Sequence, residues 1–198
     1  MPPMLAFDVY GTLIDPHGVV IKLQELVGVK AEEFSRVWRE KQLEYSFRRG
    51  LMRSYENFAV CTSQALDYTC RYLDAGLTTD QKAALMAEYQ CLPAFDDVEE
   101  SLVGLKAAGH SLYAFSNGAA DAVEKLLAVA GSRDLFDGVV STDDRHTFKP
   151  NPDVYEHLLK TTAASASDAW LISSNPFDVI GAVSYGLRSA WVQRTNNS

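Results

Sequence analysis

Two carboxylates and a lysine occupy positions in this sequence from which they could carry out a hydrolysis together. Asp8 follows the apolar run 4–7, Lys149 precedes a proline, and Asp178 lies closer to the carboxyl end of the chain. A carboxylate can attack a substrate and form a covalent ester, and a neighbouring lysine would keep that carboxylate ionised. A second carboxylate could accept a proton from the water that cleaves the ester. Taken alone, Asp8 is more simply an aspartate that caps a turn, so the rest of the chain must decide between the two interpretations.

Further polar side chains follow apolar runs in the same way. Ser116 and Asn117 come after the run 111–115, and Ser173 comes after 169–172. The carboxyl ends of parallel strands meet at one edge of an open sheet, where ligands bind. We therefore expect the following side chains to converge: Asp8, Ser116, Asn117, Lys149, Ser173, Asn175 and Asp178.

The apolar runs that precede these residues alternate with amphipathic segments along the chain. The runs predict five strands, over residues 4–9, 111–115, 136–141, 169–172 and 189–192. Strands that alternate with helices favour a parallel sheet with right-handed crossovers. The sequence therefore predicts an α/β fold with a Rossmann-like core, formed by residues 1–15 and 92–198.

The remaining residues, 16–91, have a helical pattern and predict a cap subdomain inserted after the first strand. Within them, Arg39 shares one face of a predicted helix with two apolar residues, so it could point into an apolar cavity or extend along the surface. Gly50 is expected to end this helix, and Ser54 is expected to cap the next one.

Composition excludes several classes of protein. The chain has 198 residues and a net charge of −8, so it lacks the basic excess that general nucleic-acid binding requires. No basic, apolar leader and no run long enough to span a membrane is recognised. Three cysteines without a CxxC spacing favour reduced thiols in a cytoplasmic protein rather than a zinc site.

The segments that carry the polar side chains resemble the four motifs of the haloacid dehalogenase superfamily. The stretch 7–13 resembles the first motif, 116–118 the second, 149–150 the third and 173–178 the fourth. Phosphatases of this superfamily place a second aspartate where this chain has Tyr10, and acidic magnesium ligands where it has Ser-Ser-Asn. The resemblance therefore implies no metal ion and no other cofactor.

Within the superfamily, the chain is most similar to the L-2-haloacid dehalogenases. Residues 37–45 and 57–58 are similar to the cap sequence of that group. The resemblance implies metal-independent hydrolysis of short (S)-2-haloacids to (R)-2-hydroxyacids, through an aspartyl ester and with inversion at C2. It also implies a small 2-haloalkanoate as the substrate and, by analogy with the family, a homodimer. Together with the charge and the hydropathy, the sequence therefore predicts no nucleic-acid partner and no membrane.

The resemblance also implies a role for each matching residue. Asp8 is the nucleophile, Lys149 is the cation beside it, and Asp178 activates water. Arg39 and Asn117 receive the halide. The implied catalytic set is Asp8, Thr12, Arg39, Lys149, Tyr155, Ser173, Asn175 and Asp178. The implied substrate-binding set is Val9, Tyr10, Leu43, Phe58, Ser116, Asn117 and Phe177, and members of the family often have tryptophan at the last of these positions.

Simpler interpretations of some residues stay open at this point. Tyr155 could pack within a helix, Thr12 could be a turn residue, and Ser173 could be a hydroxyl at a strand end. A magnesium-dependent phosphatase and a non-catalytic binding protein on the same fold are the two alternative functions. Neither the preferred halogen, fluoride included, nor the chain length follows from the sequence.

Overall fold

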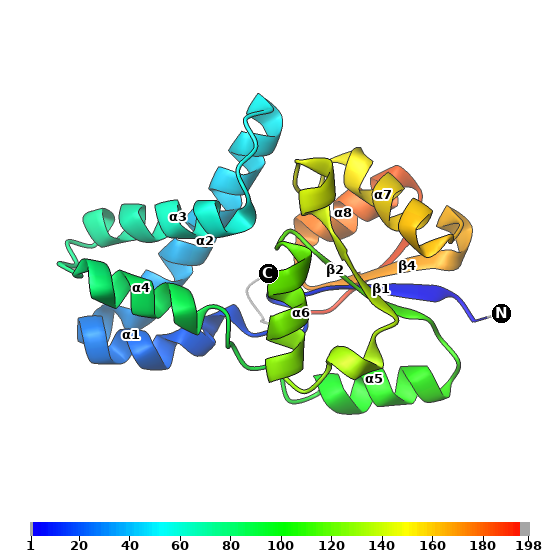
Figure 1. Cartoon of the computed structure of the whole chain (residues 1–198), viewed down its shortest axis with the longest axis horizontal. Helices are drawn as coiled ribbons and strands as arrows, with labels where there is room; N and C mark the ends of the chain where they lie inside the picture. Colours follow the sequence, from blue (N-terminus) through cyan, green and yellow to red (C-terminus); the bar gives the residue numbers. More distant parts are fainter. Residues whose placement is uncertain (1, 195–198) are drawn as a thin grey trace.

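The computed structural model describes residues 2–194 of the chain. Its centre is a parallel sheet of five strands in the order β3-β2-β1-β4-β5 (Figure 1). The strands are β1 (Met4–Asp8), β2 (Leu112–Ser116), β3 (Gly138–Ser141), β4 (Ala169–Ser173) and β5 (Arg188–Trp191). The predicted α/β class and parallel sheet are confirmed, and each strand lies within two residues of its predicted bounds.

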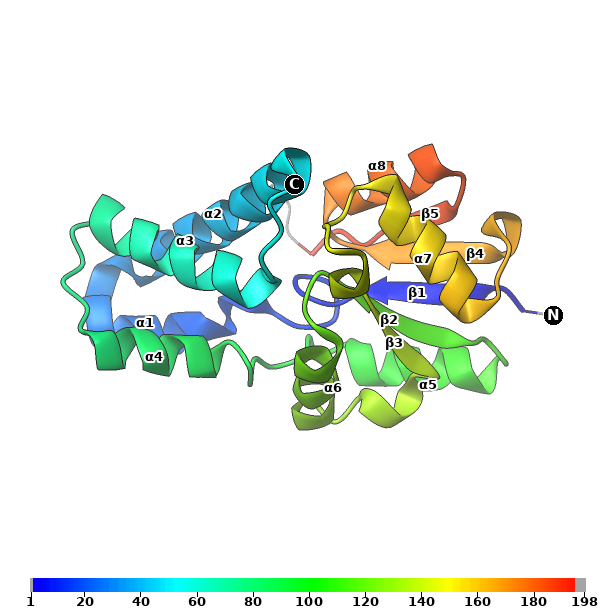
Figure 2. The same cartoon turned by 45° about the horizontal axis from the view of Figure 1, so that its top comes forward.

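Four helices cover the two faces of the sheet. They are α5 (Val98–Ala107), α6 (Ala120–Val129), α7 (Pro152–Thr162) and α8 (Pro176–Tyr185). The first two lie on one face and the last two on the other (Figure 2). Side chains alternate between the faces of a strand, so Leu5 and Phe7 pack in one apolar cluster, whereas Met4 and Ala6 pack in the other. Strand β1 is therefore buried on both sides, as its continuous apolar run predicts.

The register of the sheet brings three strand ends together. Asp8 at the end of β1 pairs with Phe115 on β2, and Phe7 pairs with Ile172 on β4. Strand β1 is central, and the chain continues to β2 on one side and to β4 on the other. Ligands in open α/β sheets bind at such a reversal of strand order, which here lies at Asp8.

A helical unit occupies the sequence between β1 and α5. It consists of α1 (Val20–Val27), α2 (Ala31–Met52), α3 (Phe58–Tyr72) and α4 (Thr79–Glu88), and it lies beside the carboxyl ends of the strands (Figures 1 and 2). Aromatic rings connect it to the sheet region: Phe148 packs against Phe58 and Tyr55, with ring centroids 6.2 and 5.1 Å apart. The division into residues 16–91 and the rest stays a prediction about folding units.

Two local predictions in this unit are wrong. Gly50 does not end α2, which continues to Met52. A Cβ at Gly50 would lie 3.4 Å from Thr147 Oγ1, so the glycine lets the helix pass close to the sheet region. Ser54 is not a cap of α3. Its N–H donates to the carbonyl of Arg49 and closes α2, whereas Asn57 caps α3 by accepting from the N–H of Val60 at 3.0 Å.

Candidate active site

Lys149 lies between two carboxylates at the carboxyl edge of the sheet. Its Nζ donates to Asp8 Oδ1 at 3.0 Å, to Asp178 Oδ2 at 2.8 Å and to the carbonyl of Phe115 at 2.7 Å. These contacts use all three protons of the ammonium group. The side chains of Lys149 and Asp178 are 1% and 0% exposed, and that of Asp8 is 10% exposed. Asp8 is therefore the member of this trio that a substrate can reach.

The surroundings of the trio shift the pKa values of two of its members. Burial alone would lower the pKa of Lys149, but the carboxylates of Asp178 and Asp8 outweigh burial and raise it. Burial raises the pKa of Asp178, Lys149 opposes that rise, and Asp8 adds to it. Lys149 therefore stays charged near neutral pH, and Asp178 is a stronger proton acceptor than an ordinary aspartate.

Groups from two other segments fix the orientation of Asp8. Thr12 Oγ1 and Asn175 Nδ2 both donate to Asp8 Oδ2, at 2.8 and 2.7 Å. Thr12 in turn accepts from the N–H of Ser174 at 2.9 Å, which ties the turn after β1 to the end of β4. Three donors, counting Lys149, therefore hold the Asp8 carboxylate in one orientation.

Tyr155 and Ser173 contact the partners of Asp8 rather than Asp8 itself. Tyr155 donates its hydroxyl to Asp178 Oδ1 at 2.8 Å, and burial followed by the charge of Asp178 raises the pKa of the phenol. Ser173 Oγ accepts from the N–H of Asn175 at 3.1 Å. Both are positioning residues in this geometry.

Gly181 makes the contact between Tyr155 and Asp178 possible. A Cβ on this glycine of α8 would overlap the Tyr155 hydroxyl and Pro150. Helices α7 and α8 approach closely only because position 181 lacks a side chain. This glycine was not among the predicted site residues, and its position one turn after Phe177 was the only sign of its role in the sequence.

Ser116, the last residue of β2, and Asn117, which follows it, differ in the hydrogen-bonding groups that they leave unpaired. Ser116 Oγ accepts from the N–H of Gly118 at 3.1 Å. Asn117 Oδ1 accepts from the N–H of Lys149 at 3.0 Å and from Thr142 Oγ1 at 3.2 Å. These bonds orient the amide of Asn117, and its Nδ2 has no acceptor within residues 2–194. Asn117 therefore offers a donor at the strand edge.

Arg39 reaches this edge from α2 in the helical unit. Its Nη2 donates to the carbonyl of Tyr10 at 3.1 Å, and its Nη1 donates to Gln42 Oε1 at 2.6 Å. Asn175 Nδ2 donates to the same Tyr10 carbonyl at 3.1 Å. Arg39 therefore neither points into a purely apolar cavity nor extends along the surface, because its guanidinium group turns toward the sheet edge and meets two polar acceptors there. Gln42 was not among the predicted site residues, and its spacing of three residues from Arg39 was its signal in the sequence.

Four of the predicted substrate-binding residues line three separate cavities. Tyr10 and Phe58, with ring centroids 6.0 Å apart, line one of about 100 Å³. Leu43 lines a second of about 400 Å³ beside Arg39. Phe177 lines a third cavity of about 430 Å³.

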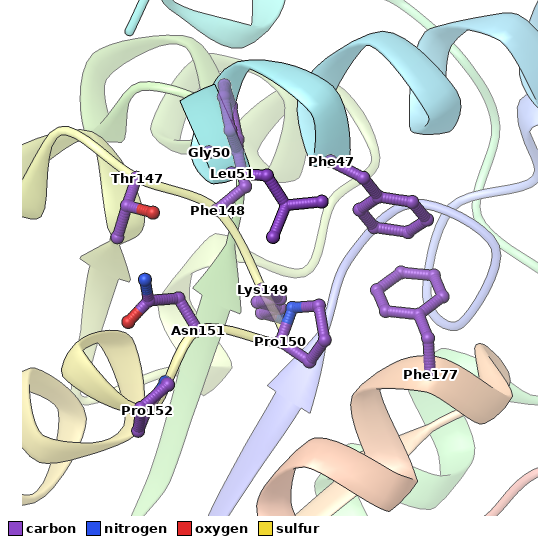
Figure 3. Close-up of a pocket in the computed structure, with 10 residues that line it drawn as sticks. All are labelled: Phe47, Gly50, Leu51, Thr147, Phe148, Lys149, Pro150, Asn151, Pro152 and Phe177. Carbon is purple, nitrogen blue, oxygen red and sulfur yellow. The ribbon is translucent and has the colours of Figure 1, made fainter. Parts of the chain in front are cut away.

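The third cavity lies between the end of α2 and the start of α8 (Figure 3). Phe47 on α2 packs against Phe177 on α8 at one side of it, with ring centroids 4.9 Å apart and the rings nearly perpendicular. Its other lining residues are Gly50, Leu51, Thr147, Phe148, Lys149, Pro150, Asn151 and Pro152. The cavity is largely apolar and reaches Lys149.

Val9 differs from the other predicted substrate-binding residues. It is fully buried, and its side chain packs in the apolar cluster on one face of the sheet. Its carbonyl accepts from the N–H groups of Leu13 and Ile14, at 2.9 and 3.0 Å. Val9 therefore shapes the turn after Asp8.

Two classes of feature are absent within residues 2–194. No cluster of three or more histidine, cysteine, aspartate or glutamate side chains has the arrangement of a metal site. No helix in this part of the chain combines the length and the apolar character needed to cross a bilayer.

Comparisons with known proteins agree with this arrangement. The sequence profile of haloacid dehalogenase-like hydrolases matches residues 3–186. The (S)-2-haloacid dehalogenase of Pseudomonas sp. strain YL is 38% identical over 193 residues, which cover 98% of this chain and 83% of that protein. Haloacetate dehalogenase H-2 of Moraxella sp. strain B is 34% identical over 190 residues, covering 96% and 85%.

Solved structures give the same result for the fold. The L-2-haloacid dehalogenase of Xanthobacter autotrophicus with covalently bound chloropropionic acid aligns with a TM-score of 0.93 and 35% identity. The alignment covers 100% of this chain and 80% of that one. The arrangement of strands and helices described above is therefore shared with proteins of known activity.

Proposed function

Because the chain belongs to the haloacid dehalogenase-like hydrolase family, we propose that it hydrolyses short (S)-2-haloacids to (R)-2-hydroxyacids. One observation carries the proposal: Asp8 is the most exposed member of a buried trio, and Lys149, Thr12 and Asn175 donate to its carboxylate and orient it. In the same trio, Lys149 places a cation beside the attacking carboxylate of Asp8. The proposed reaction uses no metal ion, since the ammonium group of Lys149 lies between the two carboxylates.

In the first step, a carboxylate oxygen of Asp8 attacks C2 of the substrate from the side opposite the halogen. The C–O bond forms as the carbon–halogen bond breaks, and the halide leaves with the bonding electron pair. Displacement in line inverts C2, so an S substrate yields an R ester. Negative charge develops on the halogen in this step, and preorganised donors stabilise such charge most effectively. Arg39 and the free Nδ2 of Asn117 are the donors that we assign to it.

In the second step, water attacks the ester carbonyl of Asp8. Asp178 accepts a proton from this water, and the bond between the Asp8 carbonyl carbon and the ester oxygen, which came from Asp8, breaks as that oxygen takes the proton from Asp178. The product leaves as the 2-hydroxyacid with its inverted configuration, the oxygen of the water stays on Asp8, and the second proton of the water passes to solvent as Asp8 returns to a carboxylate. Lys149 contacts both carboxylates, so its charge offsets theirs before the ester forms and after it is hydrolysed.

Halide release in the presence of EDTA tests this proposal. We expect purified protein to release chloride from L-2-chloropropionate and chloroacetate, and to form D-lactate from the former. Phosphate release from a generic ester that depends on added magnesium, without any halide release, would replace the proposal with the phosphatase. The absence of both activities would favour a binding protein on the same fold.

We also propose that the protein is a cytoplasmic homodimer. Leu51 on α2 and Ile180 on α8 are large apolar side chains that are 86% and 68% exposed. Leu51 lines the cavity between these two helices, and Ile180 lines a second cavity beside α8. A face of this kind is typical of an interface. Light scattering after size-exclusion chromatography would measure the mass in solution, and fractionation of cells would locate the protein.

A further inference from the structure

Gln42 is a buried amide on α2 that makes a hydrogen bond at each end. It lies three residues after Arg39, and its Oε1 accepts from Arg39 Nη1 at 2.6 Å. Its Nε2 donates to Thr62 Oγ1 on α3, also at 2.6 Å, and its exposed fraction is 0%. Burying an amide costs free energy unless its polar atoms are paired. Both polar atoms of the Gln42 amide have a partner, so the neighbouring side chains offset the cost of burying it.

Only one orientation of the Gln42 amide satisfies the hydrogen bonds around it. Thr62 donates its single hydroxyl proton to the carbonyl of Phe58, one turn earlier on α3, at 2.8 Å. Its oxygen must therefore accept from the amide nitrogen of Gln42, which turns the amide oxygen toward Arg39. A guanidinium group has donors only, so this orientation satisfies both partners. Through the side chains of Gln42 and Thr62, hydrogen bonds therefore connect the Arg39 guanidinium group to the backbone of α3.

The acceptors that hold Arg39 are uncharged. They are the carbonyl of Tyr10 and the amide of Gln42, and within residues 2–194 no carboxylate lies within ion-pair distance of Arg39. One turn earlier on the same helix, Arg36 pairs with Glu40 at 2.8 Å. A neutral acceptor orients a guanidinium group without cancelling its charge, so the charge of Arg39 stays available to an anion.

We propose that Gln42 is a positioning residue for the halide site. It holds the Arg39 guanidinium at the end of β1 and, because it is uncharged, preserves the affinity of that group for the departing halide. The inference rests on the proposed function. A glutamate at position 42 would keep the shape and the acceptor, but its charge would pair with Arg39 and compete with the halide.

The substitution Gln42→Glu separates the position of Arg39 from its charge. Chloride binding is measured by the broadening of the chlorine NMR line, which needs no turnover, and kcat is measured by halide release from L-2-chloropropionate. We expect Q42E to bind chloride at least about tenfold more weakly, because contacts to a charged group contribute strongly. We expect kcat to fall by a similar factor and KM to change less than kcat.

The pH profile distinguishes this role from a purely structural one. When the carboxyl group introduced in Q42E is protonated, it has the same shape as the glutamine amide, with an acceptor toward Arg39 and a donor toward Thr62. Arg39 favours the ionised form of that carboxyl group and burial opposes it, and Tyr89 is the other titratable group that contacts position 42. The defect of Q42E should therefore persist while the introduced carboxyl group is ionised and shrink, relative to the wild type at each pH, only as the pH falls through the pKa of that group. Gln42→Leu removes the acceptor at every pH, and its defect should not recover. Circular dichroism of each variant establishes that it is folded, and Q42L tests the acceptor if Q42E does not fold.

Gln64→Glu is the matched control. Gln64 Oε1 accepts from Arg49 Nη2 at 3.0 Å on the surface, so the same change beside an exposed arginine should alter neither chloride binding nor kcat. Wild-type chloride binding and kcat in Q42E at every pH would overturn the inference. A wild-type protein that releases no halide would refute the proposed function, and line broadening would still test whether Gln42 governs anion binding at Arg39.

Discussion

The sheet edge and the helical unit hold their parts of the candidate site in different ways. At the sheet edge, Asp8 and Lys149 lie 141 positions apart in sequence, and each makes three hydrogen bonds through its charged group. The helical unit contributes Arg39, which is half-buried and has two neutral acceptors. The groups that would make and break the ester are therefore fixed more firmly than the group that would receive the halide.

The contacts between the two regions explain this difference. The helical unit packs on the sheet region through aromatic rings such as Phe58 and Tyr55 against Phe148, and apolar contacts are not directional. The trio at the sheet edge is held by hydrogen bonds, which are directional. Substitutions at the sheet edge should therefore abolish single steps of the reaction, whereas substitutions in the helical unit should change rates and preferences.

The largest effect is expected at Asp8. Asp8→Asn removes the nucleophile but keeps the size of the side chain, and we expect turnover to fall by about 10⁴-fold or more. Halide release from L-2-chloropropionate measures it, and circular dichroism controls for folding. A variant that turns over at the wild-type rate would eliminate the ester mechanism and, with it, the contrast between the two regions.

Asp178→Asn should block the second step and leave the first. The ester then accumulates on Asp8, so we expect a burst of about one halide per enzyme and a loss of about 10²- to 10⁴-fold in steady-state turnover. Mass spectrometry of the Asp8 peptide would detect the added substrate group. Steady turnover without any accumulated ester would assign the activation of water to another residue.

Arg39→Gln tests the helical unit directly. Removing a donor to developing charge typically costs about 10²- to 10³-fold in kcat, and we expect a loss in this range that is smaller for bromide than for chloride as the leaving group. The ratio of kcat for 2-bromo- and 2-chloropropionate measures it. Equal losses for both halogens would place Arg39 outside the halide site.

The acid limb of ester hydrolysis should lie at a higher pH than an ordinary aspartate would give. Asp178 accepts a proton only when ionised, and burial raises its pKa. As the pH falls through that raised pKa, the second step should slow by about tenfold per pH unit. Single-turnover kinetics would isolate this step, and a limb at the ordinary aspartate value would contradict the role of Asp178.

The smallest effect is expected at the ring pair of Phe47 and Phe177. These rings, 4.9 Å apart, form one side of the cavity in Figure 3. Phe47→Ala should favour 2-chlorobutyrate over 2-chloropropionate by about fourfold in kcat/KM, the value of one buried methylene. An unchanged ratio would show that the cavity does not receive the substrate chain.

Much of the fold could be predicted because its signals are local. The apolar run 4–7 predicts β1, and a polar residue directly after such a run marks the strand end. The predictions for Gly50 and Ser54 were wrong because a single glycine does not have to end a helix. Gly50 lies in the last turn of α2, where its cost relative to alanine is only about 1 kcal/mol, and the N–H of Ser54 bonds the end of α2 instead of the start of α3.

The sequence by itself determined which chemical groups stand at the strand ends, since the order of residues along a strand places them there. Only the tertiary structure decided their partners. Lys149 joins Asp8 and Asp178, and Gln42 joins Arg39 to α3, because the packing of helices against the sheet brings these atoms within hydrogen-bond distance. A hydrogen bond requires about 3 Å between its atoms, and spacing along the chain does not define distances between separate elements at that scale.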